Sequence, residues 1–316
     1  MEDRLRLLLK LAIKYHATDI HFMLTNGESL IEMRIDGVCR KVKSSPLDRK
    51  MIRYLQYLSN LDVGIMRQPQ TGQFEFDVDG QIVPLRFAVI NDVSMMNGVL
   101  RILNSRLEIS VSNLSKIEVQ NNYFKRILKK DCGLIIFSGP TGSGKTTSLY
   151  TLLKSVNGKK IYSIEDPIEI RQDDMVQLSI NESTGFDYEK AIEQILRHDP
   201  DIIMVGEIRD SKAALGAVKA ANTGHLVLTT LHASKASSCI SRMVELGVNE
   251  SHLYENLITI VNQRMMHNSI THQRQVIFEI MDLYEIEYYR QNGRNSESFY
   301  SISRQIEWGI ENGSFT

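Results

Sequence analysis

The sequence lacks most of the features on which small secreted proteins and membrane-spanning proteins depend. Its three cysteines, Cys39, Cys132 and Cys239, lie far apart and form no CxxC pair, so neither a zinc site nor a redox dithiol is indicated. No run of about 18 uncharged apolar residues occurs, so no segment is predicted to span a bilayer. Basic residues interrupt the leucine-rich N-terminus, which excludes the apolar core of a signal peptide.

An excess of one charge is also absent. The 37 Lys and Arg residues nearly balance the 38 Asp and Glu residues, and the formal net charge is −1. This balance argues against a broad basic surface, so we expect no direct nucleic-acid binding. The chain has 316 residues, of which 42% are apolar and only six are proline, which is enough for two ordinary soluble domains with little disorder.

Residues 1–105 predict a small α+β domain. Short alternating segments turn at two Asp-Gly pairs, as β-hairpins do. In an expected helix at 5–16, Arg6, Lys10 and Lys14 recur on one side, which either faces solvent over a packed core or meets a membrane surface or a partner. The expected strands are residues 19–24, 30–35, 37–41, 74–78, 82–87 and 99–103, and a second helix is expected at 47–59.

A second domain is predicted over residues 121–316, after a lightly structured connection at 106–120. Short apolar runs alternate there with helical segments, which indicates a parallel sheet with helices on both faces. The runs are residues 134–137, 161–164, 202–205 and 226–230. Helices are expected after the capping residues Asp187, Asp210 and Asn249 and over about 235–247, and the helix after Asn249 has the stripe Leu253, Leu257, Val261 and Met265. The last 45 residues show a mixed pattern.

One segment carries a phosphate-binding motif. Residues 139–146 match G-x-x-x-x-G-K-[ST], with an apolar strand before them and a helix after them. Glycines let backbone N–H groups curl around a phosphate, the lysine adds a point charge, and the threonine offers a hydroxyl to Mg²⁺. The candidate nucleotide-binding residues are Gly139, Pro140, Thr141, Gly142, Ser143, Gly144, Lys145, Thr146 and Thr147.

Acidic residues follow two of the apolar runs. Glu207 comes directly after 202–205 and Gly206, where a carboxylate can hold Mg²⁺ through water or polarise the attacking water. Glu165, Asp166 and Glu169 follow the run at 161–164. These three are either solvated loop charges or a general base with a metal-orienting group, and composition does not decide between the two.

Two histidines flank the run at 226–230. His225 precedes it and His232 follows it. Each histidine either senses a γ-phosphate through a charge-assisted hydrogen bond or forms hydrogen bonds only within its own loop.

Together these segments resemble the secretion ATPases of type II secretion and type IV pilus assembly. GPTGSGKTTSLY is similar to that family's Walker A motif, IYSIEDPIEI to its aspartate box, ILRHDPDIIMVGEIRD to its Walker B motif and ANTGHLVLTTLHAS to its histidine box. The resemblance extends to the first domain, in ATDIHF, RIDG, LDVGIMRQPQTGQF, LRF and VLRIL. It implies a RecA-like P-loop ATPase core of the α/β class with a smaller N-terminal PAS-like α+β domain. It also implies a ring of six chains with ATP and Mg²⁺ bound between the two domains of each chain.

The resemblance also implies roles for particular residues. Lys145 and Thr146 match the phosphate and Mg²⁺ contacts, Glu165 the proposed general base, and Glu207 the Walker B acid. His225 and His232 match the histidine-box sensors. Arg86 and Arg101 match arginines of the first domain that reach the γ-phosphate.

The sequence departs from the family pattern in three places. TGQ stands at 71–73 where the family has DGR, MNG stands at 96–98 where the family has a charged contact, and no cysteine lies between 263 and 275, so no zinc is expected. A short, zinc-free chain with one N-terminal domain resembles the competence pseudopilus ATPase of Gram-positive bacteria. That branch implies a cytoplasmic hexameric motor at the inner face of the membrane, recruited by a polytopic platform protein, that assembles a DNA-uptake pilus.

The sequence is also compatible with other functions. A pilus retraction motor has a similar short chain, and the loss of one arginine also fits a regulatory module that binds ATP without hydrolysing it. RecA-like rings also move DNA, but a chain of net charge −1 lacks the excess of positive charge that binds the phosphate backbone of DNA.

Overall fold

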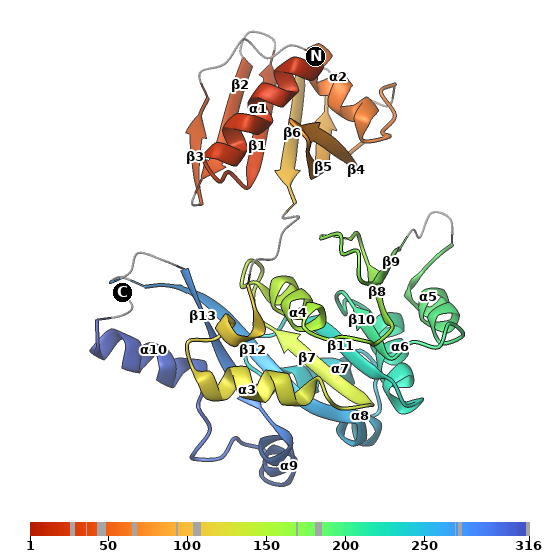
Figure 1. Ribbon diagram of the computed structural model, residues 1–316, viewed down its shortest axis with the longest axis vertical. Helices are drawn as coiled ribbons and strands as arrows, with labels where there is room; N and C mark the ends of the chain where they lie inside the picture. The colour runs from red at the N-terminus through yellow and green to blue at the C-terminus, as the bar shows by residue number, and fades with distance from the viewer. Residues whose placement is uncertain are drawn as a thin grey trace. The chain divides into compact units, whose positions relative to one another are not determined.

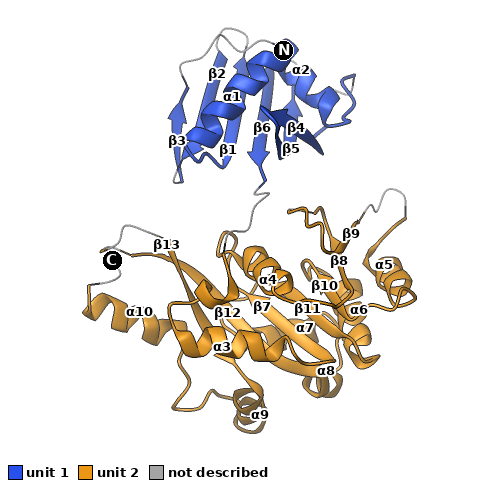
Figure 2. Ribbon diagram, in the orientation of Figure 1, with its two compact units in different colours: residues 1–106 blue, residues 107–316 orange. Residues whose placement is uncertain are grey.

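The computed structural model describes residues 1–313 except 26–28, 36, 43–48, 65–67, 93, 104–108, 169, 181–184, 269 and 271–273. The chain divides into unit 1, Met1–Arg106, and unit 2, Leu107–Thr316 (Figure 2). The expectations that concern Asp36, Glu169 and residues 106–108 lie outside the described residues.

Unit 1 is an antiparallel sheet with two helices (Figure 1). The strand order is β3-β2-β1-β6-β5-β4. The elements are α1 (Glu2–Lys14), β1 (Asp19–Thr25), β2 (Ser29–Ile35), β3 (Val38–Lys41), α2 (Arg49–Leu58), β4 (Gln70–Val78), β5 (Gln81–Asn91) and β6 (Met95–Ile102). The strands and helices predicted for this region are confirmed, with shifts of a few residues at their ends.

Both helices of unit 1 pack on the same sheet face. Leu5 and Leu9 of α1 and Ile52 of α2 are buried against alternate strand residues, among them Phe22 and Phe87. On the other side of α1, Arg6 pairs with Glu2 at 2.7 Å and Asp3 at 3.3 Å, and Lys10 pairs with Asp79 at 2.5 Å. Of the two interpretations of α1, the structure therefore supports a core-packed helix, and acidic partners compensate most of its basic side.

Unit 2 is built around a seven-stranded sheet. Its elements are the 3₁₀-turn Val111–Asn113, α3 (Glu118–Ile127), β7 (Gly133–Ser138), α4 (Lys145–Lys154), β8 (Ile161–Glu165), β9 (Val176–Ser179), α5 (Tyr188–Ile195), β10 (Ile202–Val205), α6 (Ser211–Asn222), β11 (Leu226–Leu231), α7 (Ser238–Glu245), α8 (Glu250–Asn256), β12 (Leu257–His267), β13 (Arg274–Met281), α9 (Leu283–Asn292) and α10 (Ile302–Glu311). The strand order is β13-β12-β7-β11-β10-β8-β9, and each neighbouring pair is parallel except β12 with β13. The predicted parallel sheet is confirmed.

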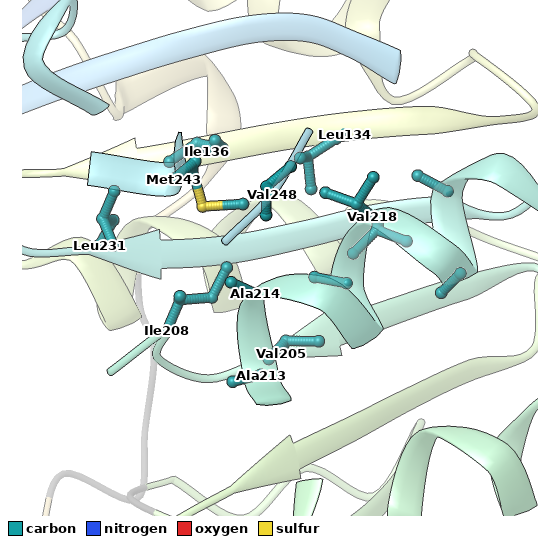
Figure 3. Packing of buried hydrophobic residues seen from close by; sticks show 14 of the residues in the cluster. Leu134, Ile136, Val205, Ile208, Ala213, Ala214, Val218, Leu231, Met243 and Val248 are labelled. Atoms are coloured by element: carbon teal, nitrogen blue, oxygen red, sulfur yellow. The ribbon is translucent and has the colours of Figure 1, made fainter. Parts of the chain in front are cut away.

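Helices cover both faces of this sheet. Leu134 and Ile136 of β7 pack toward α6, whose Ala213, Ala214 and Val218 lie close to the strands (Figure 3). The intervening residues of β7 face the opposite core, which contains Phe124 of α3 and Leu149 of α4. The predicted caps are also present, because the side chains of Asp187 and Asp210 accept backbone N–H bonds at the starts of α5 and α6.

One predicted element was wrong. The helix expected after Asn249 ends at Asn256, and Leu257–His267 is the strand β12, which lies between β7 and β13. The run Ile-Thr-Ile-Val at 258–261 is β-branched and buried on both faces, which favours a central strand over an amphipathic helix. Of the expected stripe, Leu253 lies in α8, and Leu257, Val261 and Met265 lie in β12.

The connection between the domains is also more ordered than expected over its described part. Val111 and Leu114 are buried with Phe124 in the core of unit 2. The Asn121 side chain holds this segment through the backbone of Ser112 and Ser115. Residues 111–120 therefore belong to the second unit.

Candidate active site

The phosphate loop joins the end of β7 to the start of α4. Gly139, Gly142 and Gly144 all have positive φ values, and Gly144 is the left-handed N-cap of α4. At Gly139 (φ 141°), a β-carbon would lie 2.3 Å from the carbonyl oxygen of Gln263. The loop geometry therefore requires glycine at this position for both its backbone angle and its close approach.

Lys145 is buried at the first position of α4, with 8% of its surface exposed. Its ammonium group donates to the carbonyl oxygens of Gly139 at 2.8 Å and Pro140 at 3.1 Å. The lysine thus curls back over its own loop, so its charge is placed at the mouth of the loop, next to the start of the α4 dipole.

Strand β12 supports the phosphate loop from the side. The amide of Gln263 donates to the carbonyl oxygen of Ser143 at 2.5 Å, and the amide of Asn262 donates to Ser138 and to the carbonyl of Ala233. Because β12 was predicted as a helix, sequence reasoning missed these two residues. A polar pair at the end of a buried β-branched run was the available signal.

A cavity of about 760 Å³ opens beside the loop within unit 2. Its walls include Pro140, Thr141, Gly142 and Ser143 of the loop, two methionines of β12 and Phe299. Lys235, Arg264 and Arg304 give it a basic lining. The cavity therefore offers apolar surface and positive charge next to the place where phosphates would bind.

The strands after the loop bring the acidic residues to the same edge of the sheet. Strands β7, β11, β10 and β8 are parallel and in register, with Ser138 opposite Leu231 and Val205 opposite both Thr229 and Ile164. Residues that follow these strands therefore meet at their carboxyl ends, as in other open α/β sheets.

Glu207 lies at this edge in a charged cluster. One carboxylate oxygen contacts His232 Nε2 at 2.9 Å, and the other contacts Arg209 Nη2 at 2.6 Å and Nε at 2.8 Å. Arg209 also lies 3.6 Å from Asp166. The hydrogen bond to Glu207 raises the pKa of Arg209 above its usual value. Sequence reasoning missed Arg209, although it stands two residues after Glu207.

Glu165 is the last residue of β8 and is buried, with 3% of its surface exposed. Its Oε1 atom accepts hydrogen bonds from the Tyr150 hydroxyl at 2.5 Å, the Ser163 hydroxyl at 2.7 Å and the Gln177 amide at 3.3 Å. Glu165 is therefore not a solvated loop charge. The chemical role that the sequence left open stays a prediction for Glu165.

The structure does not bring His225 into this group. His225 immediately precedes β11, and its ring contacts Thr223 and the carbonyl of Ala220. The six residues of β11 separate it from His232, a span of about 20 Å. His225 therefore lies at the edge of the sheet where the parallel strands begin, and the phosphate loop lies at the edge where they end. We therefore propose no sensor role for His225.

Arg86 and Arg101 lie in unit 1. They stand directly opposite each other on β5 and β6, and Arg101 is opposite Asp19 of β1. Arg101 contacts Asp19 at 2.8 Å, with 58% of the Arg101 side chain exposed. Burial raises the pKa of Asp19, but hydrogen bonds from Arg101 and Thr18 outweigh it and hold that pKa below its usual value.

Residues 1–306 match the family described as type II/IV secretion system protein. The chain belongs to this family. The resemblance inferred from the sequence motifs is therefore confirmed, and the secretion ATPase family accounts for a nucleotide site at the phosphate loop.

Individual relatives agree with this assignment. The chain is 40% identical to "Protein transport protein HofB homolog" of Haemophilus influenzae, over 81% of this chain and 56% of that protein. It is 36% identical to "Competence protein ComGA" of Bacillus subtilis, over 79% of this chain and 72% of that protein. This member of the family thus spans little more than half the length of the HofB homologue.

Solved structures show the same fold. The structure of the pilus retraction motor PilT with bound ADP superposes with a TM-score of 0.74 and 28% sequence identity, covering 98% of this chain and 90% of PilT. The predicted P-loop ATPase fold is confirmed. In the part of the chain that the structure describes, no helix is long and apolar enough to cross a membrane.

Proposed function

We propose that this protein is an ATP hydrolase that powers assembly of a type II secretion or type IV-like pilus of the competence type. The observation that carries the proposal is the meeting of three groups at one sheet edge: the glycine-rich loop with Lys145, the buried Glu165 and the Glu207–His232 pair. Relatives named for competence and for type II secretion support the pilus-related role.

The phosphate loop is proposed to bind the triphosphate. Its backbone N–H groups and Lys145 meet the phosphate charge, and Thr146 and Thr147 occupy the first turn of α4, where anions are favoured. The cavity beside the loop is proposed to receive the nucleoside end of ATP, since it combines methionine and phenylalanine surface with basic side chains.

The residues present fit a magnesium ion held together with ATP. The Thr146 hydroxyl and the partly exposed Glu207 carboxylate are hard oxygen donors, which Mg²⁺ prefers. An ion bound there is proposed to take its other ligands from the phosphates and from water. Bound there, Mg²⁺ would neutralise charge on the β- and γ-phosphate oxygens.

Glu165 is proposed as the general base. Its carboxylate would accept a proton from the water that attacks the γ-phosphorus, while ADP leaves. Glu207 and His232 are proposed to orient this water and to contact the γ-phosphate, because they lie 2.9 Å apart at the carboxyl edge of the sheet.

The proposal also covers the assembly in which this chemistry works. Arg86 and Arg101 of unit 1 are proposed to supply positive charge to the γ-phosphate during turnover, as arginine fingers do. Six chains are proposed to form a ring that a polytopic platform protein recruits to the inner face of the cell membrane. We propose no zinc and no direct nucleic-acid binding.

A retraction motor is the second candidate. The similarity to PilT, at 28% identity over 98% of this chain, favours it. Expression of the protein in two strains separates the two directions of force. In a strain that lacks the assembly motor of its DNA-uptake pilus, the protein should restore pili and transformation. If it instead restores pilus retraction in a strain that lacks its retraction motor, the second candidate is favoured.

Hydrolysis is tested with the purified protein. Lys145→Ala should abolish ATP turnover, and Glu165→Gln should still bind Mg-ATP but turn it over at least ~100-fold more slowly. Lys154→Ala, on the exposed end of the same helix, is the matched control and should keep the wild-type rate. Tight ATP binding without turnover by the wild-type protein would instead identify a regulatory module.

A further inference from the structure

The side chains around Glu165 suggest how this carboxylate is held in place. Tyr150 comes from α4, Gln177 from β9, and both reach Glu165 at the end of β8. We propose that Tyr150 is a positioning residue that fixes the Glu165 carboxylate relative to the phosphate loop, and that Gln177 orients the Tyr150 hydroxyl for this purpose. This inference rests on the proposed role of Glu165 as the general base.

The backbone settles the orientation of the Gln177 amide. Its oxygen accepts the N–H of Gln172 at 2.8 Å, and its nitrogen donates to the carbonyl of Ile170 at 2.9 Å. A backbone N–H can only donate and a backbone carbonyl can only accept, so both contacts require the same orientation of the amide. The nitrogen of Gln177 therefore faces Tyr150.

This orientation determines where the tyrosine proton points. The Gln177 amide donates to the Tyr150 oxygen at 2.8 Å, so the hydroxyl serves as an acceptor on that side. The Tyr150 proton is then directed at Glu165 Oε1, 2.5 Å away. A donor aimed at the carboxylate stabilises its charged form, which is the form that a general base needs.

The place of Tyr150 on α4 links the base to the phosphate loop. Tyr150 stands four residues after Thr146, so the two side chains lie on one face of the helix, and helical side chains tilt toward the N-terminus. The Tyr150 ring is fully buried in the core formed by α3, α4 and the sheet. The hydroxyl is thus held rigidly, and the helix that carries Lys145 and Thr146 also sets the position of Glu165.

A double-mutant cycle tests whether Tyr150 acts through Glu165. Tyr150→Phe keeps the buried ring and removes only the hydroxyl. We expect kcat to fall by about 10-fold to 100-fold, the effect of one hydrogen bond to a charged group, with nucleotide affinity changed by less than about threefold. In the Glu165→Gln background, single-turnover hydrolysis should show no further loss from Tyr150→Phe.

A second cycle pairs Gln177→Leu with Tyr150→Phe. Gln177→Leu should lower kcat in the wild-type background and have a smaller effect once the Tyr150 hydroxyl is absent, when only its direct 3.3 Å contact with Glu165 is lost. Tyr162→Phe is the matched control, because its hydroxyl contacts the carbonyl of His198 at 3.4 Å, at the other end of β8. It should keep the wild-type kcat.

The outcomes separate this inference from the proposed function. Independent, multiplicative losses from Tyr150→Phe and Glu165→Gln would overturn the positioning role and leave the general base in place. An unchanged kcat in Tyr150→Phe would do the same. A wild-type kcat in Glu165→Gln would overturn the base assignment, and the positioning role with it.

Discussion

Gly206 passes so close to Glu165 that a β-carbon on Gly206 would lie 3.0 Å from Glu165 Cγ. The same β-carbon would lie 3.1 Å from the carbonyl oxygen of Ile164. The Gly206 N–H donates to this carbonyl at 2.8 Å, and the Gly206 carbonyl accepts from Thr230 at 2.7 Å. The residue before Glu207 therefore packs directly against the proposed base, and its backbone is hydrogen-bonded to Ile164 and to Thr230.

Gly206→Ala should slow turnover more than it weakens nucleotide binding. The added methyl group must displace Glu165 or its strand by a few tenths of an ångström, and small displacements of catalytic groups are costly. We expect kcat to fall by about 10-fold to 100-fold. Gly216→Ala is the control, because its methyl group would crowd only the end of the Ile192 side chain. Equal kcat values for Gly206→Ala and wild type would show that the base tolerates displacement.

Glu207→Gln should alter the Mg²⁺ requirement. The change removes the charge that pairs with Arg209 and His232 and leaves a weaker oxygen ligand for the ion. The Mg²⁺ concentration that gives half-maximal ATPase activity should rise by about 10-fold, the scale of one lost charge-assisted contact. Glu245→Gln, an exposed acid paired with Arg242, should leave the Mg²⁺ titration unchanged. If the Mg²⁺ dependence of ATPase activity is unchanged in Glu207→Gln, residues other than Glu207 hold the ion.

The sequence predicted those parts of the site that depend on local spacing. The loop at 139–146, the strand before it and the acid after β10 each follow from a few neighbouring residues, and the parallel sheet fixes where Glu165 and Glu207 must lie. Capping by Asp187 and Asp210 is equally local, because each side chain accepts an N–H three residues ahead.

The missed parts depend on contacts between distant segments. Gln263 contacts Ser143 across 120 residues, and no local pattern pairs them. The sequence predicts a helix after the loop but no role for Tyr150, because the partners of its hydroxyl come from β8 and β9. The histidine-box resemblance implies a sensor role for both His225 and His232, but the two ends of a strand lie at opposite edges of the sheet.

Asp19→Asn should reduce the stability of unit 1 in a pH-dependent way. The folded state lowers the Asp19 pKa, so the ionised carboxylate stabilises the fold above its unfolded pKa of about 4, and this stabilisation is lost as the pH falls through the folded pKa. The difference in unfolding free energy between wild type and Asp19→Asn should be full at pH 7 and shrink below about pH 4. Urea unfolding, followed by hydrogen exchange in peptides from β1 and β6, measures this difference. Asp131→Asn, with a 93% exposed side chain, should show no such dependence.

Two arginines of unit 1 lie opposite each other on neighbouring strands. Arg86 and Arg101 are direct cross-strand partners, and like charges in that position are destabilising unless another group compensates them. Asp19 compensates Arg101, and no ion pair of Arg86 is found among the described residues. A pair of positive charges kept on one sheet face fits a role toward an anion, so Arg86→Ala and Arg101→Ala should each be measured for kcat and for nucleotide affinity.

If these arginines act on the γ-phosphate, kcat should fall much more than affinity in at least one variant, by about 1000-fold for the loss of a full arginine finger. Arg101→Ala also removes the 2.8 Å ion pair of the buried Asp19 and leaves it only the Thr18 hydroxyl and the more distant Arg34, which by itself destabilises unit 1. The double variant Arg101→Ala with Asp19→Asn removes the buried charge that has lost this ion pair, so a kcat that stays low while stability recovers assigns the loss to chemistry. Unchanged kcat in both Arg86→Ala and Arg101→Ala, with folding intact, would identify unit 1 as a structural spacer.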